Sequence, residues 1–267
     1  MAGARVLIMN MDSPQEGKYL EQRSSCGAHS RLVEDGNNIY ILWGETCHSF
    51  GFTTTTANVE FCDYVQNEYK KVFFCDDISS EFGVNILDVV YGMLCVLILQ
   101  ITPMEKPRSF SSVAFLGEDL YICGGMGESG CTNYVEVYNS EDNSWRVGMP
   151  MLKRRGGAGV TVMDGRIYVI GGQDSYGYEQ SSVERYAPDI GVWEELPQML
   201  CGRAFFGATV MNGKINVCGG IFKMAKLNTV ECFDPKTMRW SAVTPMLVPV
   251  ADAAVVSHGN RIFVIGV

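Results

Sequence analysis

The sequence has few of the residues that bind nucleic acid, and it has no long apolar run. Its 21 lysines and arginines are outnumbered by 30 aspartates and glutamates, which gives a formal net charge of -9 and a pI near 4.9. A surface that neutralises phosphates needs clustered positive charge, so the composition argues against nucleic-acid binding. The longest uncharged apolar run, Val89–Leu99, is shorter than the roughly 20 residues that span a bilayer. Val6–Met9 is too short for the core of a secretory signal, so we expect a soluble chain with no membrane partner.

The sequence also lacks the common catalytic and metal-binding signatures. It contains no G-x-S-x-G, P-loop or H-E-x-x-H motif. Cys26-x-x-His29 and Cys47-His48 are not joined by a second pair at zinc-finger spacing, which predicts no metal site. The ten cysteines are scattered and the chain holds no N-x-S/T acceptor, so reduced thiols in the cytoplasm are favoured over a secreted disulfide framework. We therefore expect neither a metal nor a cofactor.

An internal repeat of 47 or 48 residues carries most of the information in the sequence. Five markers keep this spacing: a methionine, an arginine four residues later, a glycine pair sixteen residues after the arginine, a Val-Glu pair, and a tryptophan ten residues after the valine. Such a period indicates a solenoid or a propeller. The markers are Met104, Met151, Met199 and Met246; Arg108, Arg155 and Arg203; Gly124-Gly125, Gly171-Gly172 and Gly219-Gly220; Val135-Glu136, Val183-Glu184 and Val230-Glu231; and Trp145, Trp193 and Trp240.

Each unit is predicted to form short strands. In Arg166–Ile170 both alternating faces are apolar or aromatic, as in a strand covered on both sides, and the glycine pair ends it. Val183–Pro188 alternates and stops at a proline-led turn, after which Trp193 opens another strand. Four short strands per repeat is the pattern of a propeller blade, so we expect an all-β fold.

These motifs resemble those of the kelch family, in particular the Kelch-like proteins, over residues 104–267. The resemblance implies a kelch-type β-propeller that binds proteins. Kelch-like proteins typically carry six blades behind a BTB and a BACK domain and act as substrate receptors of cullin-type ubiquitin ligases. The expected partner is therefore a protein substrate, with a cytoskeletal partner, as in actin-associated kelch proteins, as the alternative. Cullin would be recruited only through a BTB domain, for which residues 1–22 are too few.

Some related propellers are enzymes, including copper-dependent galactose oxidase and a sialic acid mutarotase. A radical-copper site needs two histidines, but His29, His48 and His258 fall in a weak first unit and a truncated last one. We expect no catalysis.

The resemblance also implies which residues line the partner-binding mouth: those just after each Met-x-x-x-Arg and just after each glycine pair. For the arginines themselves a structural role is favoured over a binding role, because they recur in every good unit. Non-repeating aromatic residues are better candidates for specificity. The candidate partner-binding residues are Arg108, Ser109, Met126, Arg155, Gly156, Gln173, Tyr176, Tyr178, Arg203, Ala204, Ile221 and Phe222. The glycine pairs, the glutamates and the tryptophans are expected to be structural, and Cys123 and Cys218 to be small core residues.

The expected propeller is incomplete, with about four blades plus two strands of a fifth. The blades are placed at 23–71, 101–150, 151–198 and 199–245, with a partial blade at 246–267. The first blade is expected to contain a long loop at Glu45–Ala57, and residues 1–22 are assigned to no domain.

Residues 72–100 interrupt the repeat. Without them, Tyr69-Lys-Lys-Ile101 would align with Trp240-Ser-Ala-Val243. The codons for Val72 and Gln100 can supply the first and last bases of an intron. Our hypothesis is therefore a translated intron of 87 bases, and the alternative is a lineage-specific loop.

Overall fold

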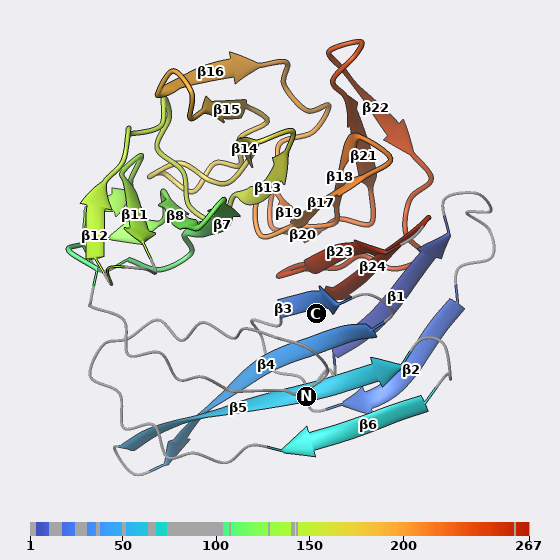
Figure 1. Cartoon of the computed structure of the whole chain (residues 1–267). Coiled ribbons are helices and arrows are strands. Elements are labelled where there is room, and N and C mark those ends of the chain that lie inside the picture. Colours follow the sequence, from blue (N-terminus) through green and yellow to red (C-terminus); the bar gives the residue numbers. More distant parts are fainter. Residues whose placement is uncertain are drawn as a thin grey trace.

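The computed structural model describes the strands within residues 4–73 and most of residues 104–266 (Figure 1). Within the second range, residues 107, 128, 140, 141, 143 and 259 are not described. The described residues form five four-stranded antiparallel sheets and two short hairpins, with no helix among them. The all-β prediction is therefore confirmed. Residues 74–103 lie outside the described part, so the interpretation of 72–100 as an insert stays a prediction.

Three sheets contain the strongest repeats, and each runs through four consecutive long strands. The first has β7 (Ser112–Leu116), β8 (Asp119–Cys123), β11 (Val135–Asn139) and β12 (Ser144–Val147). The second has β13 (Gly159–Met163), β14 (Arg166–Ile170), β15 (Val183–Ala187) and β16 (Val192–Leu196). The third has β17 (Gly207–Met211), β18 (Lys214–Cys218), β21 (Val230–Asp234) and β22 (Arg239–Val243). The short hairpins β9 (Met126–Gly127) with β10 (Gly130–Cys131), and β19 (Ile221–Phe222) with β20 (Ala225–Lys226), link second and third strands.

A fourth sheet is formed by the weak first unit. It has β3 (Arg31–Asp35), β4 (Asn38–Ser49), β5 (Phe52–Asp63) and β6 (Glu68–Phe73) in chain order. The expectation of a long loop at Glu45–Ala57 is wrong, because β4 and β5 pair without interruption up to Ser49 opposite Phe52. The extra residues lengthen a hairpin, which satisfies their backbone groups in the ladder.

The fifth sheet differs from the expectation of a two-stranded partial blade. Its C-terminal strands, β23 (Ala254–His258) and β24 (Arg261–Gly266), are joined by β1 (Ala4–Asn10) and β2 (Lys18–Ser24) in the order β2-β1-β24-β23. The N-terminal segment, which the repeat pattern assigns to no domain, therefore supplies the two outer strands of this blade. Pairing β24 with β1 covers an edge that would otherwise expose unpaired backbone groups.

The core lies between neighbouring sheets. The second strands β8, β14 and β18 are buried along almost their whole length, as predicted for Arg166–Ile170. Tyr168 and Ile170 pack against Phe233 and Trp240 of the next sheet, and the same relation recurs between the preceding pair of sheets. In Figure 1 the first strands β7, β13, β17 and β23 face the middle of the arrangement, while β12, β16 and β22 lie on the outside. This is the blade arrangement of a β-propeller.

Candidate functional site

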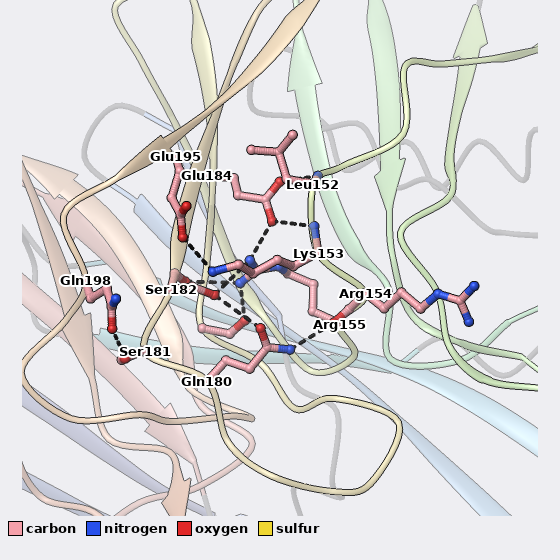
Figure 2. A network of polar contacts seen from close by, with 11 residues as sticks. Leu152, Lys153, Arg154, Arg155, Gln180, Ser181, Ser182, Glu184, Glu195 and Gln198 are labelled. Carbon is pink, nitrogen blue, oxygen red and sulfur yellow. Dashed lines mark hydrogen bonds and ion pairs between the residues drawn. The ribbon is translucent and has the colours of Figure 1, made fainter.

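A buried arginine and a buried glutamate cross-link each well-defined blade. Arg155 donates from Nη2 to Glu184 Oε1 at 2.6 Å, and from Nη1 to the carbonyl oxygens of Gly171 at 2.6 Å and Ser182 at 3.1 Å (Figure 2). Glu184 also accepts the backbone N–H groups of Leu152 at 2.6 Å and Lys153 at 3.0 Å. The carboxylate thus fixes the turn that precedes the arginine.

The same network recurs in the two other repeats. Arg203 binds Glu231 at 2.5 Å and the carbonyl oxygen of Gly219 at 2.9 Å, and Arg108 is paired with Glu136. Side chains in all three ion pairs are 3% exposed or less. Burial lowers the pKa of the Arg155 guanidinium, and the charge of Glu184 opposes that shift. Each carboxylate therefore stabilises a guanidinium that no water reaches.

This burial corrects part of the predicted binding site. Arg155 and Arg203 are 1% and 0% exposed, Ala204 is 1% exposed, and Gly156 is buried as well. These residues are covered by their own or the neighbouring blade and offer almost no surface to a partner. Of the two roles considered for the arginines, the structural role agrees with this geometry.

The first glycine of each pair allows two blades to approach closely. A Cβ atom on Gly124 would lie 2.4 Å from the backbone oxygen of Arg155, and one on Gly171 would lie 2.6 Å from that of Arg203. The N–H of the second glycine, Gly125 or Gly172, donates to the same oxygen at 2.9 Å. The glycine pair therefore joins one blade to the next through the backbone of the buried arginine.

The tryptophans also lie where blades meet. Trp193 Nε1 donates to the carbonyl oxygen of Met149 at 2.8 Å, and Trp240 Nε1 donates to that of Pro197 at 2.9 Å. Their rings pack on neighbouring aromatic rings with centroids 5.1 to 5.2 Å apart, as does the ring of Trp145. These contacts fix the outermost strand of each blade to the rest of the molecule.

Several predicted mouth residues are brought together in pairs. The residue after each arginine exchanges two backbone hydrogen bonds with the residue after the glycine pair, at 2.7 to 3.1 Å. The pairs are Ser109 with Met126, Gly156 with Gln173, and Ala204 with Ile221. They lie at the same end of three successive blades and fix the bases of the loops that follow. The side chains of Met126, Gln173, Ile221 and Phe222 are partly exposed there, and Ser109 is exposed.

The loop after Gly172 presents two tyrosines on a rigid turn. Tyr176 and Tyr178 are 86% and 71% exposed. The Asp174 carboxylate accepts their backbone N–H groups at 2.8 and 3.0 Å, and Asp174 N donates to the Tyr178 carbonyl oxygen at 3.0 Å. The rings are thus displayed on an ordered backbone, which lowers the entropy lost on binding.

Sequence reasoning missed a second set of residues at the predicted mouth, two positions after each arginine. Phe110, Gly157 and Phe205 all have positive φ, at 54°, 62° and 56°, and they form a chain of hydrogen bonds across three blades. The Phe110 and Phe205 rings meet edge to face with centroids 5.3 Å apart, and a Cβ on Gly157 would lie 2.7 Å from the Phe205 ring. Phe110 is 44% exposed. The signal was a glycine in one unit aligned with phenylalanines in two others.

The fifth blade replaces the ion pair with apolar residues. Val250 stands where the other units have arginine, is 2% exposed, and packs with Ile262 and Val264. The register of β1 places Leu7 opposite Val264, the position that Glu231 holds opposite Val217. Both members of the pair are therefore changed together, and no lone charge is left at this position of the repeat.

The buried cysteines of the second strands are packing residues. Burial raises the pKa of the Cys123 and Cys218 thiols to about 12, which keeps them protonated and unreactive. Within 104–266, apart from the few residues left out, no group of three or more His, Cys, Asp or Glu side chains is placed to hold a metal ion. The same part of the chain contains no helix of the length and apolarity needed to cross a membrane.

Repeated four-stranded blades with an internal Arg–Glu pair define a β-propeller. A family model for the Kelch motif matches residues 107–152, 154–200 and 202–247, more than half of the chain. The chain belongs to the kelch-repeat family, and its repeats are those found in the kelch portion of Kelch-like proteins.

Individual relatives agree with this assignment. Beta-scruin of Limulus polyphemus is 31% identical over 177 residues, which is 61% of this chain and 19% of that protein. Human Kelch-like protein 23 is 42% identical over 76 residues, 28% of this chain and 13% of that protein, and Kelch-like protein 25 of Xenopus tropicalis is 27% identical over 173 residues, 61% and 29%. The chain thus spans less than a third of the curated relatives it matches. The solved structure of YjhT matches with a TM-score of 0.56 and 16% identity, covering 86% of this chain and 70% of that one, and supports the fold.

Proposed function

We propose that this chain is a protein-binding propeller that holds its partner at the mouth formed by the loops after the glycine pairs. The observation that carries the proposal is the exposure of large side chains on well-fixed loops at one end of the blades. Tyr176 and Tyr178 are largely exposed there. Phe110, two residues after the arginine of the preceding repeat, is exposed as well. Aromatic side chains on rigid loops are the residues that dominate interface energies.

The substrate-receptor role of Kelch-like proteins is the more specific form of this proposal. In that role the mouth binds the protein to be modified, and a separate domain of the full-length protein binds the ligase. Filament binding by a cytoskeletal adaptor is the alternative, and co-sedimentation of the chain with actin filaments distinguishes the two. We also place the protein in the cytosol, where its free thiols, Cys123, Cys131, Cys201, Cys218 and Cys232, would remain reduced.

Site-specific photocrosslinking tests the mouth directly. A photoreactive amino acid replaces Tyr176 in one variant and Ile190 in a matched control, because Ile190 is 67% exposed on the turn at the opposite end of the same blade. Crosslinking is carried out in cells, and the captured proteins are identified by mass spectrometry. We expect a partner that crosslinks at position 176 and not at position 190. Equal capture at both positions, or capture only at 190, would contradict binding at the mouth.

A further inference from the structure

The hairpin β19–β20 ends in a turn whose residues do not suit its backbone. Lys223 and Met224 form a two-residue connection between Phe222 and Ala225, and both have positive φ, at 48° and 64°. Two positive φ values in a two-residue hairpin loop define a type I′ turn, which strongly prefers Asn-Gly or Asp-Gly. Side chains with a long stem rarely adopt this conformation.

The same chain uses the preferred residues in two equivalent turns. Asp164-Gly165, between β13 and β14, has φ values of 52° and 67°, and Asn212-Gly213, between β17 and β18, has 52° and 69°. The backbone at Lys223-Met224 is therefore the same as at these turns. The difference is in the residues, so the Lys223-Met224 turn carries a local strain that these two turns avoid.

Packing does not compensate for this strain. Met224 is 96% exposed and Lys223 is exposed as well. The base of the hairpin is nevertheless fixed, because Ile221 pairs with Ala204 and the N–H of Leu227 donates to the carbonyl oxygen of Gly220 at 2.8 Å. Strain that is retained at an exposed, rigidly supported tip points to a function of the side chains at that tip.

The chemistry of the tip indicates the kind of partner. Residues 221–226 contain two lysines and no carboxylate, although the whole chain has a net charge of -9. Lys223 Nζ lies 5.2 Å from the centre of the Phe222 ring, and Lys226 is exposed on β20. Met224 adds an adaptable apolar side chain between these two charges. An acidic surface with an apolar side chain or pocket is complementary to this arrangement.

We propose that the Lys223–Met224 tip is a specificity element for acidic protein segments. Met224 contacts an apolar side chain of the segment, and Lys223 and Lys226 pair with carboxylates on either side of it. This inference rests on the proposed function, because the hairpin follows the third glycine pair and belongs to the mouth. It adds the chemical class of the partner.

A displayed library of random dodecapeptides, selected on the full chain, identifies the class of segment that binds. We expect the recovered peptides to be rich in Asp and Glu around an apolar residue. The strongest binder is then synthesised with a fluorescent label, and its affinity is measured by anisotropy for the wild type, for Lys223→Asn/Met224→Gly, and for Lys223→Glu/Lys226→Glu. Ile190→Gly is the matched control, because it removes an exposed apolar side chain from a turn at the other end of a blade.

The Lys223→Asn/Met224→Gly variant should change both peptide affinity and stability, whereas a turn with a purely structural role would change stability alone. We expect it to weaken peptide binding by about tenfold or more while it raises the urea midpoint of unfolding, because it relieves the strained turn. The charge-reversal variant should weaken binding similarly, and Ile190→Gly should leave it unchanged.

Several results would overturn the proposal. Peptides without acidic enrichment, or acidic peptides that bind the tip variants as tightly as the wild type, would refute the role of the tip and leave binding at the mouth intact. Recovery of no peptide at all would count against the proposed function as well. Tip-dependent binding to vesicles of equimolar phosphatidylcholine and phosphatidylserine, with no acidic peptide selected, would assign the tip to lipid instead.

Discussion

The buried ion pair of Arg155 and Glu184 should be strongly coupled, and a double-mutant cycle measures the coupling. Arg155→Met removes the guanidinium and keeps an unbranched stem. Glu184→Gln removes the charge and keeps one acceptor oxygen, so it retains only one of the two backbone contacts, because Leu152 and Lys153 donate to different carboxylate oxygens. The lost contact is common to the single and the double variant and cancels in the cycle. The double variant has no charge at this position. The cycle therefore separates the charge interaction from the backbone contacts of Glu184.

The magnitude follows from burial and from the hydrogen bonds. Both side chains are 0% exposed, so either single substitution leaves an uncompensated charge in the blade. Breaking such a pair costs about 3 to 5 kcal/mol. The double variant leaves no charge, so its loss should be close to that of one single variant. The coupling free energy is then about 3 kcal/mol or more.

Urea unfolding followed by tryptophan fluorescence provides the measurement. The surface pair Lys153–Glu195 is the control, because its side chains are 41% and 51% exposed and its coupling should be much smaller. Hydrogen exchange at the blade core would replace the urea midpoint if a purified single variant lacks a folded baseline in urea. Additivity within about 0.5 kcal/mol for Arg155 and Glu184 would refute the reasoning, because independent sites behave that way.

Three further predictions test the packing. Gly171→Ala should destabilise the chain by about 2 kcal/mol or more, since φ is +59° and the new Cβ would meet backbone, whereas Gly165→Ala has nothing within 4 Å and should cost only about 1 kcal/mol; thermal unfolding would show the difference. Iodoacetamide at neutral pH should leave Cys123 unmodified in the folded chain and modify it after denaturation, because the folded pKa of about 12 keeps the thiol protonated; mass spectrometry of labelled peptides that showed rapid native labelling would contradict the burial. Val250→Arg should destabilise the fifth blade, because it places a charge at a position that is 2% exposed among apolar residues; an unchanged urea midpoint would contradict that burial.

The repeat pattern predicts the well-defined blades because each marker has a physical task that constrains its residue type. The first glycine of a pair cannot carry a Cβ, and the glutamate must neutralise a buried arginine while it accepts two backbone N–H groups. Positions with such requirements keep their identity from unit to unit. The fold class and the strands around Arg166–Ile170 and Val183–Pro188 follow from them.

The exposed part of the mouth is less predictable because its residues have no shared task. Phe110 and Phe205 are recognised only when the unit with Gly157 is aligned with them, since their common feature is a positive φ and not a residue type. The tip at Lys223-Met224 goes against the sequence rule for its turn, so no propensity argument would place it there. Sites that select a partner are expected to depart from local rules in this way.

The third strand of the fifth blade, β1, is not found by searching for the Val-Glu marker. In the three blades with the buried ion pair, either member alone would be a buried unpaired charge, so loss of one member favours loss of the other. At Val250 the arginine is absent, and the strand that pairs with β24 accordingly has Leu7 at the position of the glutamate. The Val-Glu marker is thereby lost from β1, although its backbone keeps the register of the other blades. A search for the Val-Glu marker therefore misses β1, whereas a search for a strand compatible with Val250 has to accept an apolar residue at that position.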